Sequence, residues 1–241
     1  MLGIVLGLGS SLAWGVSDFL GGMQSRRRSA LAVLLITQPL GLIIGLVTAL
    51  LFADGLPARG DALLGVLAGV IIVSALVAFY RGMAIGPVSI VATIASLGAL
   101  VSMVGGLAQG DDPSALQLAG AAIAIAGVVL VSRQSRAVGE PIGRQALVLA
   151  LAAAAGIGTA FLLVDAAAGD EPTWAIVALR VGGISTLLAV AAVVRPEVSV
   201  DRASAPALLA IAVLEITANM LFAVATNHGL ISLVSVAGSL Y

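Results

Sequence analysis

The 241-residue sequence contains no cysteine and only one histidine, His228. Disulfide frameworks, thiolate metal sites and cysteine nucleophiles are therefore excluded. Charged residues make up only 10% of the chain, whereas soluble domains carry about 25%. The nucleotide-binding motif GxxxxGK[ST] and the zinc-protease motif HExxH do not occur either. These absences argue against an enzyme and against ATP hydrolysis, and we expect no cofactor, no metal and no nucleic-acid partner.

Hydrophobic residues are abundant instead, at 61% of the chain. They form runs of roughly 18–25 residues, the length at which a helix crosses about 30 Å of hydrocarbon. The alternation of lipid-facing and lumen-facing residues that marks a membrane β-barrel is not visible. We therefore predict an all-α fold, a polytopic transmembrane helix bundle.

The apolar runs predict eight complete membrane helices and the start of a ninth. The predicted spans are Leu2–Gly22, Ser29–Ala53, Ala62–Ile85, Val88–Gln109, Ser114–Val131, Gln145–Ala168, Thr173–Val194, Ala205–Asn227 and a run from Leu230 to Tyr241. The first run is interpreted as a span rather than a signal peptide because no basic region precedes it. The connections are short, so no separate soluble domain is expected.

An internal repeat relates the two parts of the chain. The stretch Phe79–Leu97 returns 143 residues later as Phe222–Leu240, with glycine and serine at equivalent places. We predict two repeats, residues 1–143 and 144–241, the second incomplete. Five helices per repeat is an odd number, so the second repeat should lie inverted in the membrane, as in many secondary transporters. On this plan the second repeat would run to about residue 276, so roughly 35 residues with a tenth helix should be missing.

Arginine placement supports the inversion. The cluster Arg26–Arg28 corresponds to Gly169, Asp170 and Glu171, a reversal of sign. Nine arginines fall at odd-numbered connections: Arg26, Arg27, Arg28, Arg81, Arg133, Arg136, Arg144, Arg195 and Arg202. Only Arg59 falls at an even-numbered one. Because arginine is retained on the cytoplasmic side, this bias predicts an N-terminus outside the cell, the alternative being chance in a short list.

Three stretches resemble a known family. They are SLAWGVSDF, AFYRGMAIGPVSIVATIASLGALVS and QLAGAAIAIAGVVLVS, and in this order they resemble the EamA-type branch of the drug/metabolite transporter superfamily. The resemblance covers nearly the whole chain. It implies ten helices in two inverted repeats around a central substrate cavity that works by alternating access. The chain departs from the pattern because it lacks the end of the ninth helix and the tenth. Its arginines also oppose the N-inside orientation usual in the family.

The first candidate site residues lie in the first repeat. Trp14 and Asp18 are four residues apart and share one face of the first helix, which predicts a cavity wall that binds a cation or exchanges a proton. The alternative is that Asp18 pairs at the surface with Arg26 or Arg27. Tyr80, near the end of the third span, is a further candidate for the cavity.

The other candidates lie around the deepest carboxylate of the chain. Glu215 stands about ten residues into its span, and Asn219 lies on the same face. A charge at that depth needs a partner or water, and Arg180 is the expected partner. The pair is either structural, fixing two helices, or faces the cavity and recognises substrate or couples to protons. Gln38 is expected to face Arg180 across the cavity.

These features favour a secondary active transporter in the cell membrane. We expect it to export a small metabolite, an amino acid or a drug-like molecule by alternating access. A non-transporting scaffold or receptor, or an inactive fragment, is the alternative. The expected partners are the substrate, the lipid bilayer and a proton or other coupling ion, with a homodimer left open.

Overall fold

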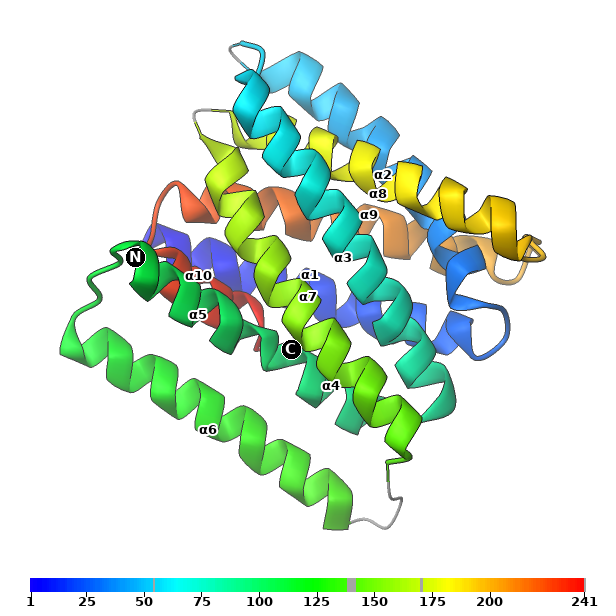
Figure 1. Cartoon of the computed structure of the whole chain (residues 1–241), viewed down its shortest axis with the longest axis horizontal. Helices are drawn as coiled ribbons and strands as arrows, with labels where there is room; N and C mark the ends of the chain where they lie inside the picture. Colours follow the sequence, from blue (N-terminus) through cyan, green and yellow to red (C-terminus); the bar gives the residue numbers. More distant parts are fainter. Residues whose placement is uncertain (54, 138–141, 170, 241) are drawn as a thin grey trace.

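The computed structural model describes residues 1–53, 55–137, 142–169 and 171–240, and in these residues it contains helices and their connections but no strand (Figure 1). The helices are α1 (Leu2–Ser25), α2 (Ala30–Phe52), α3 (Arg59–Ile85), α4 (Val88–Ser96), α5 (Gly98–Gln109), α6 (Ala115–Ala137), α7 (Arg144–Ala168), α8 (Pro172–Val194), α9 (Ala205–Thr226) and α10 (Ile231–Gly238). Asp170, matched above to Arg27, lies outside the described residues, as do the side chains of Arg133 and Arg136.

Among the described residues, seven helical segments are long and apolar enough to cross a membrane. They are α1, α2, α3, the continuous stretch Val88–Gln109, α7, α8 and α9. Within the described residues, α6 has a shorter apolar part, Ala115–Gly127. The chain is therefore a polytopic membrane helix bundle, as predicted. The main difference in length is α6, which continues to Ala137 instead of ending at Val131.

The fourth predicted span is present as the apolar helical stretch Val88–Gln109, with a turn at Leu97 that was not predicted. At Leu97 the N–H donates to the carbonyl oxygen of Ile94 (3.2 Å), a tighter turn than that of an α-helix. The Ser96 hydroxyl donates to the Thr93 carbonyl oxygen (2.9 Å), the kind of bond that bends helices. The break separates α4 from α5 within one membrane crossing.

The connections gather at two ends of the bundle. Arg28 joins the α1–α2 connection to the α8–α9 connection through an ion pair with Asp201 (3.0 Å). Arg26 donates to the carbonyl oxygen of Gly86 between α3 and α4 (3.2 Å). At the other end, Asn227 donates to the carbonyl oxygen of Gly169 (2.9 Å), so the α9–α10 and α7–α8 connections meet. Odd-numbered predicted connections thus contact one another, and so do even-numbered ones.

The contacts between helices repeat with the same 143-residue offset as the sequence. The most extensive helix contacts are those of α3 with α7 and of α1 with α9, and the offset converts one pair into the other. The helix α2 packs against its own equivalent, α8. In Figure 1, α6 lies at the edge of the bundle, where it packs against α4 and α10. That the two halves lie inverted in a membrane stays a prediction.

Candidate functional site

A buried polar triad joins α2, α8 and α9. Nη1 of Arg180 lies 3.0 Å from Oε1 of Glu215 and also donates to Oε1 of Gln38. The Gln38 amide donates to both carboxylate oxygens of Glu215, at 2.9 and 3.1 Å. Arg180 is only 1% exposed, so both charges are removed from solvent and lipid. The expected Arg180–Glu215 pair is formed, and Gln38 bonds both of its members.

The backbone around the triad is shaped to hold the guanidinium. A Cβ at Gly41 would lie 3.3 Å from Cζ and Nε of Arg180, so the glycine leaves the space that the planar group occupies. One turn after Glu215, the side chain of Asn219 donates to the Glu215 carbonyl oxygen (2.7 Å). Nε and Nη2 of Arg180 find no hydrogen-bond acceptor among the described residues. The guanidinium is therefore held firmly on one edge only.

A second carboxylate lies on α1. Asp18 is 6% exposed, and the hydroxyl of the fully buried Tyr80 donates to its Oδ1 (3.3 Å). The space for the phenol ring comes from Gly21, where a Cβ would lie 2.4 Å from the hydroxyl oxygen. Asp18 is thus a buried residue with a partner on α3, whereas Arg26 bonds the Gly86 carbonyl oxygen.

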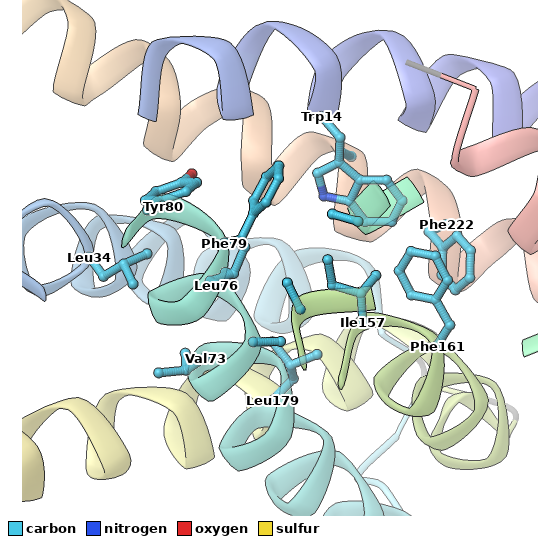
Figure 2. Close-up of a cluster of buried hydrophobic side chains, with 14 of the residues drawn as sticks. Trp14, Leu34, Val73, Leu76, Phe79, Tyr80, Ile157, Phe161, Leu179 and Phe222 are labelled. Atoms are coloured by element: carbon cyan, nitrogen blue, oxygen red, sulfur yellow. The ribbon is translucent and has the colours of Figure 1, made fainter. Parts of the chain in front are cut away.

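A central cavity lies between the two carboxylates. Its volume is about 30 Å³, enough for one or two water molecules. Asp18, Glu215 and Asn219 bring polar groups to it, and the remaining wall is apolar. Three aromatic rings form one side: Trp14 stacks on Phe161 at 5.2 Å between centroids, and Phe222 lies 4.3 Å from Phe161 (Figure 2).

The cavity wall repeats with the same 143-residue offset. Eight lining residues form four equivalent pairs: Trp14 with Ile157, Asp18 with Phe161, Ile72 with Glu215, and Leu76 with Asn219. Each pair combines a polar or indole side chain from one half with an apolar one from the other. The cavity therefore lies where equivalent faces of the two halves meet, and its polar groups are distributed asymmetrically.

The seven residues predicted for the site thus fall into two layers. Trp14, Asp18, Glu215 and Asn219 line the cavity. Tyr80 lies behind Asp18, while Gln38 and Arg180 lie behind Glu215.

Three contributors were missed: Phe161, Phe222 and Gly41. Phe161 is the repeat equivalent of Asp18, and Phe222 was already matched to Phe79, so the offset itself was the signal that could have found the two rings. Gly41 could not be found in this way, because glycines are common in apolar spans and the sequence does not show which of them contact the guanidinium. The described residues contain no group of three His, Asp or Glu placed to hold a metal ion.

Comparison with known proteins agrees with this architecture. No curated protein is similar enough to the chain to be matched. The sequence model of the EamA-like transporter family matches residues 1–133, which is more than half of the chain and contains α1 to α5 with most of α6. The chain is therefore a multi-pass membrane protein that belongs to the EamA-like transporter family.

Proposed function

We propose that the protein is a secondary active transporter of the cell membrane that exports a small molecule by alternating access through the central cavity. The observation that carries the proposal is the cavity lined by two carboxylates at the meeting of equivalent helix faces. Sites of this kind, at the interface between repeats, are where secondary transporters bind substrate. Membership of a transporter family supports the same function.

Charge and shape around the cavity favour a substrate with a positive group and an apolar body. Arg180 offsets the charge of Glu215, and Asp18 adds a further carboxylate. The faces of Trp14, Phe161 and Phe222 are attractive to cations as well as to apolar groups. An amine, such as an amino acid or a cationic drug-like molecule, therefore fits this wall better than an anion does.

The two carboxylates are also the candidates for coupling to a proton gradient. A carboxylate that alternately faces each side of a membrane can carry a proton across it. In this scheme Glu215 exchanges a proton while Arg180 and Gln38 hold its position, and Asp18 exchanges one while Tyr80 holds it.

The test is transport by the purified chain in proteoliposomes, screened with amines, amino acids and other metabolites, with and without a proton gradient. Glu215→Gln and Asp18→Asn are expected to lower gradient-driven transport at least tenfold, because neither amide binds the proton. The control is Asp112→Asn, which changes an exposed carboxylate outside the cavity. Full gradient-driven transport by both cavity variants would contradict the coupling scheme.

The small volume of the cavity favours one competing function, a non-transporting membrane scaffold or receptor. A space of about 30 Å³ admits no amino acid unless the helices move apart. If the screen finds no transported compound while the reconstituted chain is folded, the scaffold function is supported and the transporter proposal fails.

A further inference from the structure

A second, larger cavity lies away from the site above, at the end of the bundle where the arginines gather. It has a volume of about 550 Å³, within the roughly 300–1,000 Å³ typical of ligand sites. The α1–α2 connection, the second half of α3, the end of α8 and the start of the α8–α9 connection form its wall. Its charged residues are Arg27, Arg28, Arg81 and Glu197, which leave a net positive charge.

One of these arginines is committed to the protein itself. Arg28 donates to Asp201 (3.0 Å) and to the Ser204 hydroxyl (2.8 Å), and so fixes the α8–α9 connection against α2. Hydrogen bonds from the Ser204 hydroxyl and backbone N–H, aided by Arg28, hold the pKa of Asp201 below its usual value. The carboxylate therefore stays ionised at neutral pH, and Arg28 serves as a wall of the cavity rather than as a free ligand.

The other two arginines are available. The side chains of Arg27 and Arg81 are exposed and make no hydrogen bond or ion pair with any described residue. Ser25 also lines the cavity, and its buried hydroxyl has no hydrogen-bond partner among the described residues. The guanidinium groups of Arg27 and Arg81, on two sides of the cavity, are therefore free to donate hydrogen bonds to a bound anion.

Most of the rest of the wall is apolar, apart from Ser29 and Ser199. Leu31 of α2, Val77 and Ala84 of α3, and Val190 and Val194 of α8 line the same cavity. Val190 and Val194 are 40% and 62% exposed, so the apolar side faces outward from the bundle. An occupant must combine a negative head, for the arginines, with an apolar body that extends along α3 and α8.

We propose that this cavity binds the headgroup of an anionic phospholipid, with the phosphate between Arg27 and Arg81 and the acyl chains along the valines of α3 and α8. Basic pockets between transmembrane helices on the cytoplasmic side bind acidic headgroups in this way. The lipid is an anchor at the arginine-rich end and is independent of the central transport site. The repeat-equivalent sequence positions of Arg27 and Arg28 are the acidic residues Asp170 and Glu171, so the repeat does not reproduce the basic charge.

The test measures lipid binding to the purified, delipidated chain by native mass spectrometry. The ligands are dioleoylphosphatidylglycerol, dioleoylphosphatidylcholine and sn-glycerol 3-phosphate. We expect one tightly bound phosphatidylglycerol. The double variant Arg27→Gln/Arg81→Gln is expected to weaken that binding roughly tenfold or more, since each arginine near the headgroup contributes on the order of 1 kcal/mol. A second variant, Val190→Trp, keeps every charge but fills the apolar wall, and is also expected to weaken binding.

The control Arg144→Gln/Arg202→Gln removes the same charge from exposed arginines that do not line the cavity, and should change binding less than twofold. Melting temperatures without lipid verify that all variants are folded. Unchanged affinity in both test variants would overturn the proposal, as would equal binding of phosphatidylcholine. Displacement of the lipid by glycerol 3-phosphate at equal concentration would show a site for free anions and would also overturn it.

Discussion

Arg180 is a charged residue buried inside the bundle, so its position requires bonding partners. A guanidinium inside a membrane bundle is costly unless it is paired, and this one has a single edge bonded to Gln38 and Glu215. The depth of both charges in their spans was enough to predict the pair from the sequence. The way Gly41 makes room for the guanidinium was not predictable, because it depends on the relative rotation of α2 and α8, which one sequence does not reveal.

Replacing one member of the Arg180–Glu215 pair should lower the stability of the protein more than replacing both members. Arg180→Met leaves Glu215 buried without its counter-charge and is expected to lower the free energy of unfolding by about 3–5 kcal/mol. The double variant Arg180→Met/Glu215→Gln leaves no charge in the triad, and should recover more than half of that loss. Unfolding in detergent measures both, with exposed Arg202→Met as the control. A double variant as unstable as the sum of the single ones would show that the charges do not interact.

At the scale of elements, close approach of helix backbones determines how α3 and α8 pack. A Cβ at Gly69 would lie 2.0 Å from the carbonyl oxygen of Leu179, and one at Gly182 would lie 2.1 Å from that of Val66. Small residues permit such approach in membranes, where apolar surface alone does not drive helices together. The lengths of the apolar runs predicted where the helices lie. The break at Leu97 was missed because a turn with helical dihedral angles leaves hydropathy unchanged.

Adding one methyl group at this contact should force the two helices apart. Gly69→Ala is expected to destabilise the protein by about 1–3 kcal/mol, since the backbone oxygen of Leu179 has little freedom to move. The matched control is Gly120→Ala in α6, where a Cβ meets nothing within 4 Å. That substitution should be neutral or stabilising by about 0.5–1 kcal/mol, through lower chain entropy. Equal melting temperatures for the two variants would contradict the close approach.

At the scale of the whole molecule, the 143-residue offset organises both the helices and the cavity. It relates α1 to α7, α2 to α8 and α3 to α9, with boundaries that agree within about three residues. It also relates four pairs of lining residues, so the sequence alone contained the positions of the cavity wall. What it did not contain is the volume of the cavity, or that Tyr80 and Gln38, both predicted for the site, lie behind the lining carboxylates, because both depend on how tightly the halves close.

The inversion of the two halves is tested by the side of the membrane that equivalent connections face. Gly55, between α2 and α3, and Val198, between α8 and α9, are related by the offset, and both are exposed. Because the sequence has no cysteine, the variants Gly55→Cys and Val198→Cys each carry a single thiol, and no other thiol can react with the label. An impermeant maleimide should label Gly55→Cys in intact cells and Val198→Cys only after permeabilisation, since the arginine-rich end is expected in the cytoplasm. The opposite pattern would reverse the orientation but keep the inversion, whereas labelling of both from one side would exclude two inverted halves.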